Sequence, residues 1–175
     1  SDEERALEKI RRLIEDLRRM VREMLERSKK SLEEHKELAR EILRRSRESL
    51  ERLKDVARRN KEKEEDLKRL LKEHADLNRE LKKRLRDSNR EHNELNKDLK
   101  RKLRELLKEL KKRVDELPRS RELDKLREEL EEVVRRVEEK LDDSDRRANE
   151  VTREIEKTLD DLHREAEEVV KEIRR

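Results

Sequence analysis

Apolar residues recur along the chain at spacings of three and four, the spacing that places side chains on one face of an α-helix. The pattern stops after Ala57 and again at Pro118. The second interruption has a direct cause, because proline cannot continue a helix and restricts the residue before it. The pattern therefore predicts an all-α fold of three long helices, at about residues 2–59, 62–117 and 120–175.

Residue types at the ends of these segments agree with the predicted boundaries. Ser1 and Glu4 have the spacing of a capping box, in which the two side chains bind backbone N–H groups of the first turn. Asn60 is suited to the left-handed conformation that commonly ends a helix where glycine is absent. Ser120 is suited to the N-cap of the third helix. We therefore expect only short connections between the helices.

Leucine returns at one fixed interval within each predicted helix. The sets are Leu7, Leu25 and Leu43 in the first helix, Leu67, Leu85 and Leu103 in the second, and Leu123, Leu141 and Leu159 in the third. This 18-residue repeat completes about five turns, which is the period of a straight helix without supercoil. Since short connections imply antiparallel neighbours, we predict one elongated up-down-up bundle over residues 1–175, an untwisted relative of the coiled coil.

The composition supports long helices and argues against several partners. Charged residues make up 59% of the chain and hydrophobic residues 29%, and there is no glycine, cysteine, phenylalanine, tryptophan or tyrosine. The net charge of +4 arises from interleaved basic and acidic residues, and no aromatic side chain is available to stack on bases, so we expect no nucleic-acid partner. No apolar run approaches the roughly 20 residues that span a bilayer. We expect a soluble protein, cytoplasmic on recombinant expression, that binds no membrane at neutral pH.

Several positions within the apolar face carry polar residues instead. In the frame of the repeat, for example, Leu13 is matched by Ser31 and by Ser49. The polar residues that we expect to form a buried network are Ser28, Ser31, His35, Ser46, His74, Asn78, Ser88, His92, Asn96, Ser144, Asn149, Thr152 and His163.

Reflecting the chain about its two turns places most of these residues in shared layers. One layer contains Ser46, His74 and His163, a second contains Ser28, His92 and Ser144, and a third contains Ser31, Ser88 and Asn149, with His35 near Thr152 beside it. A lone buried polar group costs about 1–3 kcal/mol, whereas a satisfied network is tolerated and fixes the alignment of the helices. We therefore predict side-chain hydrogen bonds between helices in these layers.

With this architecture, the chain resembles the class of computationally designed helical bundles that carry modular hydrogen-bond networks, including histidine-containing, pH-responsive versions. The resemblance covers the whole chain and rests on the three-fold repeat and the polar layers rather than on a shared motif. It implies a designed structural or self-assembly module without a natural biochemical activity.

Two interpretations of the histidines stay open: the networks fix the alignment of the helices only, or they also titrate. Histidine changes charge between about pH 5 and 8. Because burial disfavours the charged imidazole, the second interpretation predicts that acid loosens the protein through His35, His74 and His92.

The sequence predicts no metal centre, no cofactor and no enzyme. Zinc requires three or four converging histidine, cysteine or carboxylate ligands. A predicted layer offers at most two histidines, His74 and His163. A packed bundle also provides no cleft, oxyanion hole or activated nucleophile for catalysis.

The first helix has the widest apolar face. Leu13, Met20, Leu38 and Val56 lie along its flank. Because three apolar faces already close a bundle, this extra width leaves room for another helix. We therefore expect either self-association, as a homo-oligomer or a filament, or a designed helical partner, in which case the chain is one subunit of a heterodimer and the networks serve specificity only.

Overall fold

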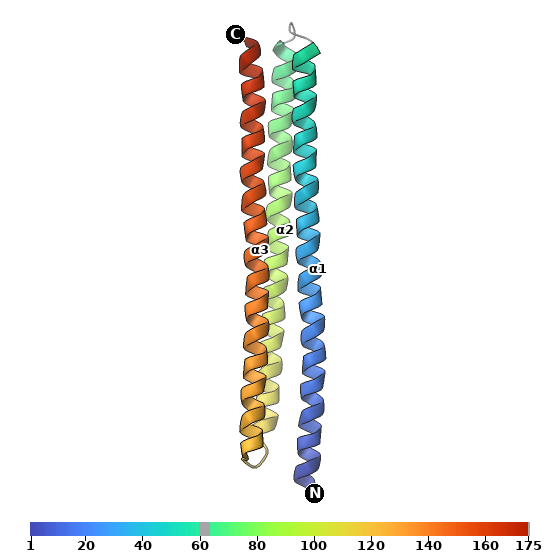
Figure 1. The fold of residues 1–175 in the computed structure, drawn as a ribbon, viewed down its shortest axis with the longest axis vertical. Coiled ribbons are helices and arrows are strands. Elements are labelled where there is room, and N and C mark those ends of the chain that lie inside the picture. Colours follow the sequence, from blue (N-terminus) through green and yellow to red (C-terminus); the bar gives the residue numbers. More distant parts are fainter. Residues whose placement is uncertain (60–63, 175) are drawn as a thin grey trace. The chain divides into compact units, whose positions relative to one another are not determined.

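The protein consists of three α-helices in the residues that the structure, a computed structural model, describes, which are residues 1–59 and 64–174. The helices are α1 (Asp2–Arg59), α2 (Glu64–Asp115) and α3 (Arg121–Arg174), labelled in Figure 1. The predicted all-α fold of three helices is confirmed.

The helix ends show why the boundaries lie where they do. The backbone N–H of Glu4 donates to the Ser1 hydroxyl at 3.4 Å, and that of Leu123 donates to the Ser120 hydroxyl at 3.3 Å, so both predicted serine caps form. The helix α2 ends at Asp115, slightly before the predicted end at Leu117. There the N–H of Leu117 bonds to the carbonyl of Val114, which tightens the turn before the proline. The predicted cap at Asn60 lies outside the described residues.

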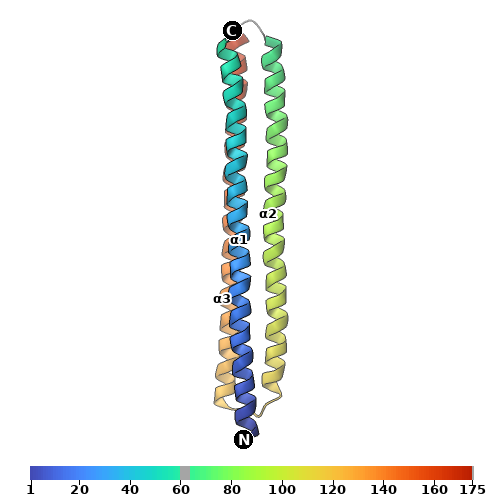
Figure 2. The same ribbon diagram turned by 90° about the vertical axis from the view of Figure 1, so that its right-hand side faces the viewer.

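The chain divides into two compact units, and each helix contributes a segment to both. Unit 1 comprises residues 1–32 and 92–146, and unit 2 comprises residues 33–91 and 147–175. Within each unit, three helical segments run alongside one another (Figures 1 and 2).

Hydrogen bonds between side chains give the direction of the helices within each unit. In unit 2, His35 of α1 pairs with Ser88 of α2, whereas Ser49, farther along α1, pairs with His74, earlier in α2. Residue numbers therefore rise on α1 as they fall on α2, which makes the two segments antiparallel. In unit 1, the pairs from Ser28 and Ser31 to α2 follow the same rule.

Each unit has its own apolar core. In unit 1, one cluster of buried leucine, isoleucine and valine side chains contains residues of all three helices, such as Leu17, Leu103 and Leu130. In unit 2, there are two clusters, one around Ile42 and one around Leu53. On α1, the sequence between these two residues contains two serines, and these belong to the site described below.

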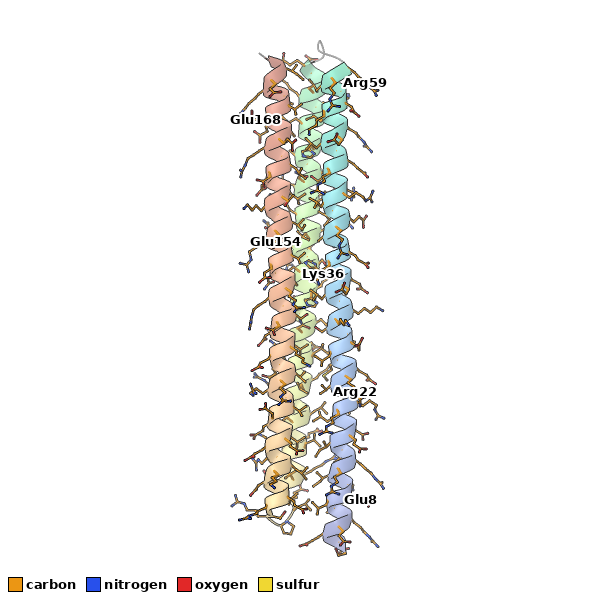
Figure 3. The ribbon with its side chains drawn as sticks, in the orientation of Figure 1. Glu8, Arg22, Lys36, Arg59, Glu154 and Glu168 are labelled. Carbon is orange, nitrogen blue, oxygen red and sulfur yellow. The ribbon has the colours of Figure 1, made fainter. Side chains whose placement is uncertain are left out.

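Charged side chains cover the outer faces of the helices. Glu8, Arg22 and Glu168 are exposed and point away from their helices (Figure 3). Within units, exposed ion pairs also join α2 to α3, as between Arg86 and Glu156 at 2.6 Å. Exposed pairs of this kind contribute about 0–1 kcal/mol each, so the fold depends chiefly on its buried residues.

Candidate functional site

The first polar network is centred on His92 and joins all three helices of unit 1. His92 Nδ1 lies 2.8 Å from the Ser31 hydroxyl of α1, and its Nε2 lies 2.9 Å from the Ser144 hydroxyl of α3. Ser28 of α1 donates to the amide oxygen of Asn96 at 2.6 Å and lies 3.2 Å from the Ser144 hydroxyl. Asn96 follows His92 by one turn of α2.

The acceptors around Asn96 determine which way its side-chain amide is turned. Its amide nitrogen lies 2.6 Å from a carboxylate oxygen of Asp145 and 3.3 Å from the carbonyl oxygen of Leu141. Both oxygens only accept hydrogen bonds, so the nitrogen must face them. The same nitrogen also lies 3.2 Å from His92 Nε2, which brings the ring into contact with the amide. The His92 network consists of Ser28, Ser31, His92, Asn96, Ser144 and Asp145.

The second network, centred on His74, repeats this arrangement in unit 2. Ser46 donates to the amide oxygen of Asn78 at 2.6 Å, and the Asn78 nitrogen donates to the carbonyl oxygen of Leu159 at 3.2 Å. His74 Nδ1 lies 2.9 Å from the Ser49 hydroxyl, and its Nε2 lies 3.4 Å from the Asn78 nitrogen. Each residue lies one sequence repeat from its counterpart in the His92 network, so the repeat of the sequence is also a repeat of the hydrogen bonds.

His163 completes the second network by a ring contact rather than by a hydrogen bond. Its ring stacks on that of His74, with centroids 6.0 Å apart and an angle of 11° between the planes. His163 Nε2 lies 3.1 Å from Glu167, and its side chain is a third exposed. Its buried Nδ1 has no hydrogen-bond partner among the described residues. The His74 network consists of Ser46, Ser49, His74, Asn78 and His163.

A third cluster, the His35 triad, occurs once and joins the three helices of unit 2. His35 Nδ1 lies 2.8 Å from the Ser88 hydroxyl, and its Nε2 lies 2.9 Å from the Thr152 hydroxyl. Thr152 donates its own proton to the carbonyl of Ala148 at 2.8 Å, so it accepts from His35. His35 therefore carries its proton on Nε2.

The structure brings most of the predicted residues together, but not always in the predicted layers. Ser28, His92 and Ser144 meet, and His74 meets His163, as the reflected register predicts. His35 meets Thr152 as predicted, but each residue of the predicted third layer forms a hydrogen bond with a residue outside that layer. Ser31 bonds to His92, Ser88 bonds to His35, and Asn149 accepts a hydrogen bond from Asn89 at 2.9 Å. Reflection about a turn locates a residue along the helix only to within about one helical turn, which is enough to misassign a neighbour.

Sequence reasoning left Ser49, Asp145 and Asn89 out of the site. Ser49 lies one repeat after Ser31, so the repeat itself marks it as a partner of a histidine. Asp145 stands in a charged stretch and gives no comparable signal, although it accepts a charge-assisted hydrogen bond from Asn96.

Burial sets the electrostatics of the two repeated networks. His35, His74 and His92 are each exposed by 1% or less. Burial lowers the pKa of His74, and the like charge of His163 lowers this pKa further. Burial also lowers the pKa of His92, against the opposing effect of the Asp145 carboxylate. Burial raises the pKa of Asp145, in spite of its hydrogen bond from Asn96. His74, His92 and Asp145 are therefore held towards their neutral forms.

The same geometry does not form a metal centre. Among residues 1–59 and 64–174, no group of three or more histidine, cysteine or acidic side chains could hold a metal ion. The nitrogen lone pairs of two stacked imidazoles lie in nearly parallel planes, so those of His74 and His163 do not converge on one point.

Comparisons with known proteins identify no family. No family model matches the sequence, and no curated protein matches it. One solved structure, described as a "Computationally designed three helix bundle", aligns with a TM-score of 0.41 and 19% sequence identity, over 98% of this chain and 86% of that chain. None of the described helices is long and apolar enough to cross a membrane.

Proposed function

We propose that this chain is a designed structural module whose buried networks fix the alignment of its helices and reduce its stability in acid. The observation that carries the proposal is that the hydrogen bonds between α1 and α2 in one network recur in the other after one sequence repeat. Ser28 and Ser46 each donate at 2.6 Å to an asparagine, and His92 and His74 each bind a serine through Nδ1. The absence of glycine and aromatic residues from the whole sequence supports the same interpretation.

The networks fix the alignment of the helices because breaking their buried hydrogen bonds costs free energy. Asn78 and Asn96 are at most 5% exposed, and their side chains are hydrogen-bonded on both the oxygen and the nitrogen. A shift of one helix would leave such groups buried without partners, at about 1–3 kcal/mol for each group. An apolar core alone would tolerate several alignments, whereas these networks favour one.

The acid response follows from the lowered pKa values of His74 and His92. Below the unfolded-state value of about 6.5, the unfolded chain binds more protons than the folded chain. Stability therefore falls as the pH drops from about 6.5, and the loss ends once the folded-state pKa of each histidine has been passed. A folded pKa lowered by one pH unit corresponds to about 1.4 kcal/mol.

The test compares the chain with the variant His35→Asn/His74→Asn/His92→Asn at pH 7.5 and pH 4.5. We expect the urea midpoint of the parent chain to fall more between these two values than that of the variant. Because the parent chain and the variant have the same surface carboxylates, the effect of protonating these carboxylates cancels when the two falls are compared. An equal fall in both proteins would refute the acid response and leave the networks with alignment alone.

The alternative function, a subunit that binds a second copy or a designed helical partner, is a second proposal. In unit 1, Met20 of α1 is 37% exposed and Leu13 is half-buried, which supports it. Light scattering in the same pH series measures the molar mass. A mass of one chain at all concentrations would refute self-association.

A further inference from the structure

The two repeated networks differ at two positions of α3. Leu162 stands one repeat after Ser144, and His163 stands one repeat after Asp145. The His92 network therefore contains a hydroxyl and a carboxylate where the His74 network contains a leucine and a second imidazole. On α1 and α2, the counterparts are identical.

This difference decides how well each network can accept a charged histidine. A protonated imidazole donates from both nitrogens. In both networks an asparagine amide nitrogen lies close to Nε2, at 3.2 Å in the His92 network. In the His92 network, however, the Ser31 hydroxyl can accept from Nδ1 and the Ser144 hydroxyl can accept from Nε2, each within 2.9 Å. The ionisable group that acts on His92 is the Asp145 carboxylate of α3, and its neighbours on α1 are uncharged serines. A charged His92 therefore keeps two acceptors and gains an anion.

A charged His74 has a poorer environment. Its Nδ1 can still donate to Ser49, but within the described chain the contact of its Nε2 is the amide nitrogen of Asn78, which is itself a donor. The ionisable group that acts on His74 is His163 of α3, and its α1 neighbours, Ser46 and Ser49, carry no charge. A proton on His163 therefore places a like charge 6.0 Å from the His74 ring.

We propose that acid opens the His74 network of unit 2 to a greater extent than the His92 network of unit 1, so that the response of the protein to pH is concentrated in one unit. This inference rests on the proposed acid response and specifies where that response is largest. The cause of the difference is that the His74 network has Leu162 and His163 where the His92 network has Ser144 and Asp145.

Asp145 acts on unit 1 in two opposite ways at lower pH. Its raised pKa means that the folded chain takes up this proton before the unfolded chain does, which stabilises unit 1 as the pH falls towards about 4. The neutral carboxyl, however, no longer stabilises a charge on His92. Lys100 of α2 and Asp142 of α3 also act on Asp145, with opposite signs. The His74 network has no carboxylate at the position equivalent to Asp145, because His163 occupies that position.

Hydrogen exchange of the full chain tests the inference, read separately for amides of unit 1 and unit 2 between pH 7.5 and pH 4.5 and corrected for intrinsic rates. We expect protection to start falling in both units below about pH 6.5, and to keep falling in unit 2 after the loss in unit 1 has levelled off. Once the pH lies below both folded-state histidine pKa values, the loss in unit 2 should be about tenfold greater for each pH unit that separates those two values. Titration of the histidine ring signals by NMR in the unmodified chain provides a second readout, in which His74 should charge at a lower pH than His92.

Two reciprocal double substitutions are matched controls. Leu162→Ser/His163→Asp copies the unit 1 environment into unit 2 and should make unit 2 more resistant to acid. Ser144→Leu/Asp145→His does the reverse and should make the loss of protection in unit 1 as large as in unit 2. Equal losses in both units of the parent chain, or grafts that leave the difference between the units unchanged, would overturn the inference while the proposed acid response stands. If neither unit loses protection down to pH 4.5, both proposals fail.

Discussion

Replacing Asn96 by leucine removes the residue that connects the largest number of partners in the His92 network. Leucine has nearly the same shape, so the substitution leaves little cavity, but it deletes the hydrogen bond from Ser28, the contacts with Leu141 and His92, and the charge-assisted bond to Asp145. The neutral bonds contribute about 0.5–1.5 kcal/mol each, and the bond to the carboxylate about 1.5–3 kcal/mol.

The matched substitution is Asn78→Leu in the His74 network. It deletes the counterpart bonds from Ser46, to Leu159 and to His74, but no carboxylate accepts from Asn78 in the part of the chain that the structure describes. The gain from burying a leucine is common to both substitutions and cancels in the comparison. The remaining difference in stability between the two substitutions comes from the bond between Asn96 and the Asp145 carboxylate. Asp145 is half-buried and can turn to water, so we reduce its contribution and expect Asn96→Leu to cost about 1–2 kcal/mol more than Asn78→Leu.

Native-state hydrogen exchange at pH 7.5 measures both losses, in unit 1 for Asn96→Leu and in unit 2 for Asn78→Leu, each relative to the parent chain. The expected gap corresponds to roughly a five- to thirtyfold difference in the opening equilibrium. The difference between the two losses should become smaller in acid, because protonation of Asp145 removes the charged acceptor. Burial raises the pKa of this carboxyl. A gap below about 0.5 kcal/mol at pH 7.5, or a larger loss for Asn78→Leu, would refute the assignment of Asp145 to the network.

Two further pairs of substitutions test the core and a helix cap. Leu103→Ala should cost about 2–5 kcal/mol in urea unfolding because Leu103 is fully buried, whereas Met20→Ala, at a side chain 37% exposed, should cost less than about 1 kcal/mol; equal losses would contradict the described core. Ser120→Ala should cost about 1 kcal/mol through loss of the N-cap of α3, and Ser120→Asp should retain most of the stability. A neutral result for Ser120→Ala would show that the cap bond is not needed.

The helices could be predicted from the sequence because their signals are local. Spacings of three and four define the buried faces, and Pro118 and Ser120 mark the second connection in the sequence itself. The end of α2 differs slightly from the prediction because the last turn tightens through a bond from Leu117 to Val114, and helix ends are the least certain part of any such prediction.

The partners of the buried polar residues were only partly predictable, because they depend on contacts between helices. The sequence repeat indicated which residue types would recur, but it did not show that Ser49 rather than Ser46 binds His74. Both serines lie on the same face of α1, less than one turn apart, and the exact antiparallel register between α1 and α2 distinguishes them. Asp145 could not be found at all, since one carboxylate among many carries no mark of its hydrogen bond to Asn96.

The repeat of the hydrogen bonds between α1 and α2 also defines a segment length by which the chain can be extended. One repeat completes about five helical turns and advances about 27 Å, so a segment of this size can be added to a helix without rotating the side chains beyond it. A matched addition to α1, α2 and α3 would carry its own Ser-x-x-Ser and His-x-x-x-Asn sequences, as in Ser46–Ser49 and His74–Asn78. The number of histidine networks would thus rise by one with each added segment. The α3 residues opposite each histidine can be chosen separately for every copy. A longer chain of this kind could contain a graded series of acid thresholds, one for each segment.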